Sequence, residues 1–92
     1  MKLNISESQN IEFKQSWRDE YIKWLSAFGN TDGGKLYIGV DDDGKIKGID
    51  NAKKLLEDIP NKVPDTLGIM VDVNLLQNED KEYLEIITDK YP

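Results

Sequence analysis

The segment Lys35–Asp41 constrains the fold most, because it alternates in polarity and has turn signals on both sides. The apolar residues whose spacing places them on one face of a strand are Leu36, Ile38 and Val40. A glycine-rich stretch precedes this segment, and Asp43-Gly44 follows it as a strong hairpin signal. We therefore expect a central strand over 35–41, a tight turn and a return strand over 45–49.

A shorter strand and a helix are predicted before the central strand. Residues Ile11–Lys14 alternate apolar and charged side chains, which is typical of a strand. Ser16 with Asp19 three residues later resembles a capping box, so we expect a helix to begin there. The helix carries an apolar stripe at helical spacing: Trp17, Tyr21, Trp24, Leu25 and Phe28. A loop with three glycines and one asparagine ends it: Gly29, Asn30, Gly33 and Gly34.

A second helix is predicted over Asn51–Leu67. Its expected buried side is formed by Leu55, Leu56, Ile59, Val63 and Leu67. Pro60 and Pro64 lack an amide N–H and clash with the preceding turn, so we expect them to kink or divide this helix.

Two further strands are predicted after the second helix. The alternating apolar residues of the first are Ile69, Val71, Val73 and Leu75. Asn78–Asp80 is expected to turn, and Tyr83–Thr88 to return. The order β-α-β-β-α-β-β predicts an α+β fold, with a mixed or antiparallel sheet packed by two helices. We expect residues 1–92 to form a single domain, belonging to a larger protein that continues past Pro92.

Composition excludes several classes of chemistry. The chain has no cysteine and no histidine, which excludes disulfides, thiolate catalysis, a Ser-His triad and zinc sites of Cys and His. Any catalysis must therefore use carboxylates, lysine, tyrosine or the backbone. No apolar run approaches the ~20 residues of a membrane span, and no signal peptide opens the chain. We therefore expect a cytoplasmic protein without membrane contact.

Two motifs with familiar spacing fail when they are tested. Gly29–Lys35 fits the start of a phosphate-binding P-loop, but Leu36 stands where Ser or Thr would hold magnesium. The predicted order, helix to loop to strand, is also the reverse of a P-loop. Asp41–Gly44 invites a calcium site, but the neighbouring ligand positions of an EF-hand are missing. Both segments are more simply interpreted as turns.

Three carboxylates near predicted strand ends are candidate catalytic and metal-binding residues: Glu7, Glu12 and Asp41. Three such groups can hold one or two Mg²⁺ or Mn²⁺ ions, which polarise a phosphodiester and activate water. Lys14 lies two residues after Glu12, on the same predicted strand face, and would neutralise developing phosphate charge. Eighteen acidic residues in 92 leave open the alternative that these acids belong to a solvated surface.

The candidate nucleic-acid contacts are the cations around the first helix and its loop: Lys14, Arg18, Lys23 and Lys35. The aromatic residues of the helical stripe could stack on bases, but their spacing is equally that of a core face. Twelve basic against eighteen acidic residues leave a net charge of −6, so scattered solvated charge is the alternative.

Two motifs together resemble the Schlafen AlbA-type domain. They are Glu7–Lys14 followed by Ser16–Glu20, and Ala27–Gly34 followed by Tyr37–Gly44. The resemblance runs from about Ser6 to the end of the chain. Members of the family usually have Ala-Asn where this chain has Gly29-Asn30.

The resemblance implies a nucleic-acid-binding, specifically DNA-binding, module at the N-terminus of bacterial transcriptional regulators. The family also carries an ATP-binding label, which the failed P-loop does not support. In animal Schlafens a related core is an RNA endonuclease with a carboxylate triad, which by motif position would fall on Glu7, Glu12 and Asp41. The alternatives are therefore a Mg²⁺- or Mn²⁺-dependent endoribonuclease and a non-catalytic protein-interaction module. Because one acidic lobe should bind weakly, we expect a homodimer or help from further domains, with DNA or RNA as the partner.

Overall fold

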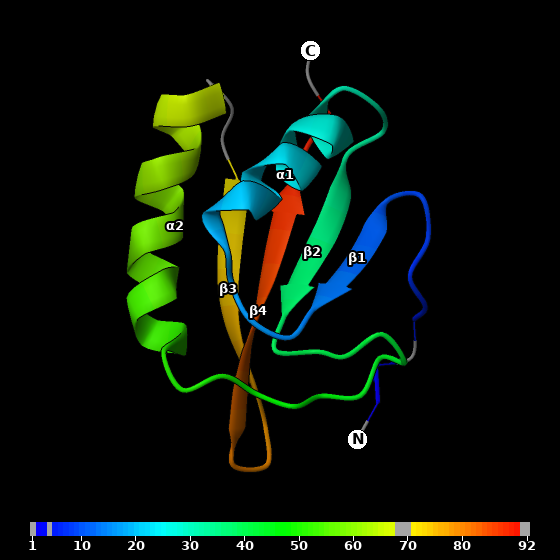
Figure 1. Cartoon of the computed structure of the whole chain (residues 1–92), viewed down its shortest axis with the longest axis vertical. Helices are drawn as coiled ribbons and strands as arrows, with labels where there is room; N and C mark the ends of the chain where they lie inside the picture. The colour runs from blue at the N-terminus through cyan, green and yellow to red at the C-terminus, as the bar shows by residue number, and fades with distance from the viewer. Residues whose placement is uncertain (1, 4, 68–70, 91–92) are drawn as a thin grey trace.

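A four-stranded sheet with two helices on one of its faces forms the fold of this computed structural model, which describes residues 2–3, 5–67 and 71–90 (Figure 1). The elements in chain order are β1 (Ile11–Lys14), the 3₁₀ turn η1 (Asp19–Tyr21), α1 (Ile22–Gly29), β2 (Gly34–Ile38), α2 (Ala52–Leu67), β3 (Val71–Asn78) and β4 (Lys81–Thr88). The strand order is β1-β2-β4-β3. Strands β1 and β2 are parallel, whereas β4 is antiparallel to both of its neighbours. The predicted α+β class with a mixed sheet is confirmed.

The expected strand at 45–49 is reduced to isolated bridges. Lys45 pairs only with Lys2, and Ile46 only with Val40. Gly39 explains the change, because its φ of 98° lies in a region where the pleat of a strand cannot continue. The expected tight turn is present, because the amide of Asp41 donates to the carbonyl oxygen of Lys45 and the amide of Lys47 to that of Gly39, but the return segment does not continue as a regular strand.

The same glycine changes the face on which Val40 lies. Leu36 and Ile38 pack with the helices, as predicted, but Val40 packs in a different cluster with Phe13 and Tyr37. The prediction that all three apolar residues of the central strand share one face is therefore wrong for Val40. Strand β2 also ends at Ile38, three residues before the predicted end.

The first helix begins later than predicted. Residues 16–18 are irregular, the 3₁₀ turn begins at Asp19, and the residue before that turn makes no side-chain cap. Asp19 instead accepts a hydrogen bond from Trp17 Nε1 at 2.8 Å. The capping-box prediction is therefore wrong. The Asp19 carboxylate accepts its hydrogen bond from the Trp17 indole, and no helix begins at Ser16.

Helix α2 continues through both prolines, so they do not divide it. Leu55, Ile59 and Val63 are buried along one side of this helix, and that packing holds it against the sheet. The burial of Leu67 and the strand assignment of Ile69 lie outside the described side chains and residues. No helix in the described part of the chain is long and apolar enough to cross a membrane.

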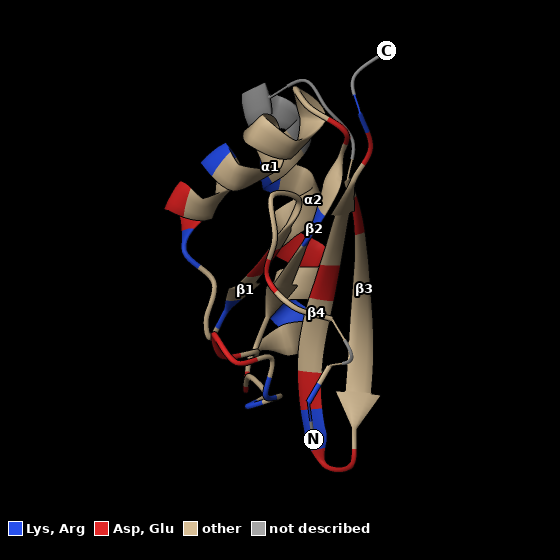
Figure 2. Cartoon of the chain, turned by 90° about the vertical axis from the view of Figure 1, so that its right-hand side faces the viewer, with Lys and Arg blue, Asp and Glu red and all other residues tan. Residues whose placement is uncertain are grey.

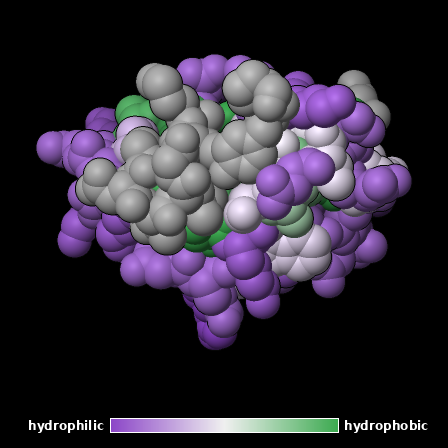
Figure 3. Space-filling view, turned by 90° about the horizontal axis from the view of Figure 1, so that it is seen from above, coloured by the Kyte–Doolittle hydropathy of each residue, from purple (hydrophilic) through white to green (hydrophobic). Residues whose placement is uncertain are grey.

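Two apolar clusters lie on opposite faces of the sheet. The cluster under the helices contains Leu25, Phe28, Leu36, Ile38, Ala52, Leu55, Ile59, Val63, Leu84 and Ile86. The cluster on the other face contains Phe13, Tyr37, Val40, Ile46 and Tyr83. Figure 2, a view along the sheet, shows both helices on the same side of the strands. Seen from above, hydrophilic side chains border most of the visible surface, and a few hydrophobic side chains show between them (Figure 3).

Candidate nucleic-acid interface

Lys14, the last residue of β1, brings a positive charge against two aromatic rings. Its Nζ lies 5.1 Å from the centroid of the Tyr21 ring and 5.5 Å from that of Trp24. The same atom is 3.7 Å from Glu12 Oε2. Strand alternation explains this position: Phe13 enters the cluster on the far face, so its neighbours Glu12 and Lys14 point toward α1. Cation–π contacts of this kind contribute about 0.5–1 kcal/mol at exposed sites.

Lys23 and Trp24 continue this surface along α1. Lys23 is exposed and has no ion-pair partner among the described residues. Trp24 is half-buried and packs partly on the core under the helices. Together with the exposed Ala27, these two residues line an open, almost wholly apolar hollow of about 430 Å³.

Arg18 stands at the entry to the same surface. Its carbonyl oxygen accepts a hydrogen bond from the amide of Tyr21, and its Nη1 lies 3.3 Å from Glu20 Oε1. Both side chains of that pair are exposed, so the pair contributes little energy. We call the surface formed by Lys14, Arg18, Tyr21, Lys23 and Trp24 the aromatic–basic face. Figure 2 shows that acidic residues interleave with the basic ones where the chain enters α1.

Asp19 ties the margin of this face to α2. Its carboxylate accepts from Trp17 Nε1 and lies 3.1 Å from Lys62 Nζ. The Trp17 N–H and then the Lys62 ammonium lower the pKa of Asp19 below its ordinary value. The Trp17 ring meets the Tyr21 ring edge-on, with centroids 6.2 Å apart. Trp17 therefore lies before the 3₁₀ turn, where its contacts with Asp19 and Tyr21 hold it in place. The prediction that it belongs to the helix is wrong.

Lys35 lies on the opposite face of the sheet and does not join the other three predicted cations. Lys35 and Tyr37 are two residues apart in β2, so their side chains lie on the same face of the sheet. Lys35 Nζ lies 3.9 Å from Glu85 Oε2. Glu85 also accepts hydrogen bonds from the Tyr37 hydroxyl at 2.8 Å and from Asn74 Nδ2 at 3.2 Å. Burial, and then the Glu85 carboxylate, raise the pKa of Tyr37 well above its ordinary value.

Glu7 and Glu12 form a carboxyl pair. Burial of Glu12 and its side-chain hydrogen bond with Glu7 raise the pKa of Glu12, while Lys14 opposes this rise. Glu7 Oε2 also accepts a hydrogen bond from the amide of Phe13 at 3.2 Å. Glu7 therefore satisfies an amide on the outer side of the edge strand β1, a structural role that the sequence did not reveal.

The Asp41 side chain accepts hydrogen bonds from the turn that follows it. Its Oδ1 accepts hydrogen bonds from the amides of Asp43 and Lys45, each at 2.9 Å. The Lys45 amide is the main cause of the lowered pKa of Asp41. Within residues 2–3, 5–67 and 71–90, no three acidic residues are grouped so that they could hold a metal ion. As arranged here, the predicted set of two glutamates and Asp41 therefore does not fit a shared Mg²⁺ or Mn²⁺.

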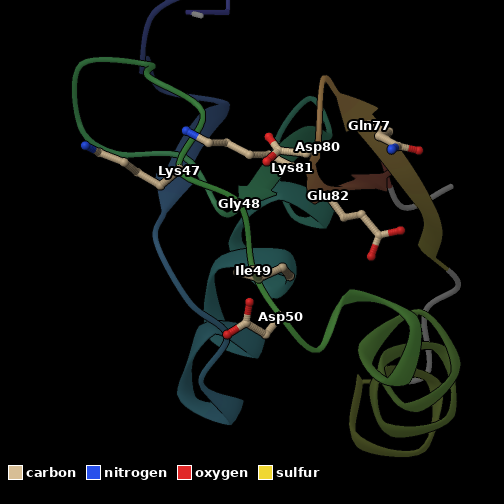
Figure 4. A pocket seen from close by; sticks show the side chains of 8 residues that line it. All are labelled: Lys47, Gly48, Ile49, Asp50, Gln77, Asp80, Lys81 and Glu82. Carbon is tan, nitrogen blue, oxygen red and sulfur yellow. The ribbon is translucent and has the colours of Figure 1, made fainter.

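A larger hollow, of about 440 Å³, lies between residues 47–50 and the β3–β4 hairpin (Figure 4). Figure 4 shows the Lys47 and Lys81 side chains extending to one side, away from Gln77 and Glu82. Basic and acidic groups are mixed in its lining and do not converge on one point. This hollow has none of the convergent polar groups that define a small-molecule site.

Two features of the surfaces were missed by sequence reasoning. Ala27 matters because it is small and exposed beside Trp24, and only its position three residues after Trp24 on a helix could have indicated this. Glu85 contacts Tyr37 and Lys35, which lie 48 and 50 positions earlier in the chain. Such long-range contacts leave no local signal in the sequence.

A comparison with protein families identifies the relationship. The family model described as Schlafen, AlbA_2 matches residues 7–92, which is nearly the whole chain. The match includes the aromatic–basic face and both members of the carboxyl pair. At the level of the family, it supports a nucleic-acid-associated domain. The chain therefore belongs to the Schlafen AlbA_2 family.

Proposed function

We propose that this domain binds nucleic acid through the aromatic–basic face. The observation that carries the proposal is the Lys14 ammonium held over the rings of Tyr21 and Trp24, with the exposed Lys23 beside them. Lysine and arginine contact phosphates, and aromatic rings stack on bases. The face offers both kinds of contact within one surface of β1, η1 and α1.

The acids around the face limit its strength. Lys14 is paired with Glu12, and Arg18 with Glu20, while the whole chain carries a net charge of −6. We therefore expect weak and salt-sensitive binding, with dissociation constants of roughly 10⁻⁴–10⁻⁶ M at physiological salt. A homodimer would present two faces to one nucleic acid and raise the affinity through avidity.

Two matched lysine variants test the proposal. Fluorescence anisotropy with labelled DNA and RNA is measured over a salt series for the wild type, Lys23→Gln and Lys35→Gln. We expect Lys23→Gln to weaken binding and to reduce the salt slope by about 1. Lys35→Gln, on the opposite face, should change neither. Absence of binding at low salt, or equal losses in the two variants, would contradict the proposal.

The finer role that we propose is that of the N-terminal DNA-binding module of a bacterial transcriptional regulator. The family match supports a nucleic-acid-associated domain, and the aromatic–basic face supplies a surface for it. A regulator must prefer some nucleic-acid sequences to others. Competition between a selected and a random pool, made once with single strands and once with duplexes, tests this role, and equal competition by the selected and random pools of both forms contradicts it.

The carboxyl pair Glu7–Glu12 beside Lys14 supports a second candidate function, cleavage of RNA. The test is incubation of labelled RNA with Mn²⁺, Mg²⁺ or a chelator. If the pair is catalytic, cleavage requires the ion and is lost in Glu12→Gln while RNA binding persists. Asp41→Asn separates the pair from the predicted triad, because only a triad needs Asp41. Cleavage that survives in Glu12→Gln excludes this site.

A further inference from the structure

We propose that the hollow beside Trp24 takes an unpaired nucleobase, so that the domain prefers single-stranded nucleic acid. This inference rests on the proposed function, because it specifies which form of nucleic acid the aromatic–basic face binds. It concerns a hollow lined by Lys23, Trp24 and Ala27 that is open, apolar and free of acidic residues.

The shape of the hollow follows from the small residue at position 27. On a helix, residues three positions apart lie next to each other, and a side chain covers the surface toward the N-terminus of its own position. A longer side chain at position 27 would therefore lie against the Trp24 indole. Ala27 leaves that space empty, so an open apolar hollow borders the Trp24 side chain.

The charges around the hollow favour a nucleotide over an uncharged apolar group. Lys14 lies over the Trp24 ring, and Lys23 lines the hollow without an ion-pair partner among the described residues. A base stacked on the indole would place its flanking phosphates within reach of these cations. Stacked bases of a duplex expose only their edges, so an aromatic surface selects bases that are unpaired.

The chain offers its own reporter for this contact. It contains two tryptophans, so Trp17→Phe leaves Trp24 as the only indole. This variant is titrated at low salt with oligothymidylate, with a duplex of equal charge, and with an abasic strand of equal length. We expect oligothymidylate to quench the Trp24 fluorescence and to bind about tenfold more tightly than the abasic strand. The duplex should bind no more tightly than the abasic strand.

Filling the hollow is the second test. Ala27→Leu keeps every charge and occupies the space, so it should weaken single-strand binding about tenfold and leave duplex binding unchanged. The matched control is Asn61→Leu, at an exposed position of α2. Trp24→Phe should retain more single-strand affinity than Trp24→Leu, because only phenylalanine can still stack on a base. Circular dichroism verifies that each variant is folded.

The outcomes separate the two proposals. Equal affinity for oligothymidylate, the duplex and the abasic strand, with unchanged Trp24 fluorescence, would overturn the inference while the domain remains a nucleic-acid binder through its cations. Unchanged single-strand affinity in folded Ala27→Leu would overturn it as well. Absence of binding to all three probes would overturn both the inference and the proposed function.

Discussion

Leu36 and Tyr37 are neighbours in β2, yet they lie in opposite environments. Leu36 is buried under the helices among aliphatic side chains, whereas Tyr37 lies on the other face and donates a hydrogen bond to Glu85. The lysines differ in the same way. Lys14, on the helix side, lies over two aromatic rings, and Lys35, on the far side, lies beside Glu85 in a polar network. The comparison shows that equal charge and proximity in sequence do not give equal surroundings, because strand alternation assigns neighbours to different surfaces.

The largest expected difference between the two faces is in stability. Leu36→Ala should lower the free energy of unfolding by about 2–5 kcal/mol, because it removes a fully buried side chain and leaves a cavity. Urea unfolding measures this change. A loss below about 1 kcal/mol would mean that the helix side repacks easily, and the two faces would then not differ as described.

The glycines of the two faces give a second contrast. A Cβ added at Gly34 would come within 2.6 Å of the Phe28 ring, so Gly34→Ala should cost about 1–3 kcal/mol through overpacking. Gly44 has room near Phe13 on the other face, but its φ is 85°. Gly44→Ala should therefore cost about 1–2 kcal/mol through backbone strain alone. Urea unfolding of both variants checks the order, and a larger loss for Gly44→Ala would reverse it.

The polar network on the far face should contribute less. Tyr37→Phe removes the hydroxyl that donates to Glu85, while Asn74 and Lys35 remain as partners of that carboxylate. We expect a loss of about 1 kcal/mol in the free energy of unfolding. Nucleic-acid affinity measured in the same preparation should be unchanged, since this face lies opposite the proposed interface. A drop in affinity would indicate that nucleic acid binds the Tyr37 face of the sheet, and would contradict the proposed interface.

The smallest expected effect is a pH dependence from Glu12. The pKa of Glu12 is raised above 4.5 by burial and by Glu7, so the folded state holds this proton more tightly than the unfolded state. Between 4.5 and the raised value the folded state binds more protons, and stability falls as pH rises. Glu12→Gln lacks this contribution, so its stability relative to the wild type should increase from pH 4 to pH 7.

The measurement for Glu12 is the urea midpoint against pH for the wild type, Glu12→Gln and the exposed control Glu57→Gln. Asp19 and Asp41 have lowered pKa values, so their stabilisation is present above 3.8 and is lost as pH falls through the lowered values. Their window therefore lies below that of Glu12. A constant difference between Glu12→Gln and the wild type from pH 4 to pH 7 would contradict the raised pKa.

Local patterns were reliable where the periodicity of apolar residues continues without a break. The strand Ile11–Lys14 has the predicted bounds, and α2 begins one residue after the predicted start and ends at the predicted residue. The errors lie at Ser16 and Gly39. The Asp19 carboxylate accepts from the Trp17 indole in place of capping a helix, and the positive φ of Gly39 ends the central strand. Residue spacing alone shows neither which donor the Asp19 carboxylate accepts from nor which backbone conformation Gly39 adopts.

The candidate site divides in the same way. The sequence indicated the residue types: carboxylates in place of histidine, and lysines near aromatic residues on a helix. Which of them meet depends on the sheet. Lys14 joins Tyr21 and Trp24, Lys35 is turned to the far face, and Asp41 is held by its own turn.

By itself the sequence determined the α+β class, most of its elements and the family, because these depend on short-range periodicity, turn residues and contiguous motifs. Only the tertiary structure decided which charges gather beside the aromatic rings. Strand order and alternation place residues from distant segments on the same face or on opposite faces, and a single positive φ at Gly39 is enough to move the next side chain from one face to the other.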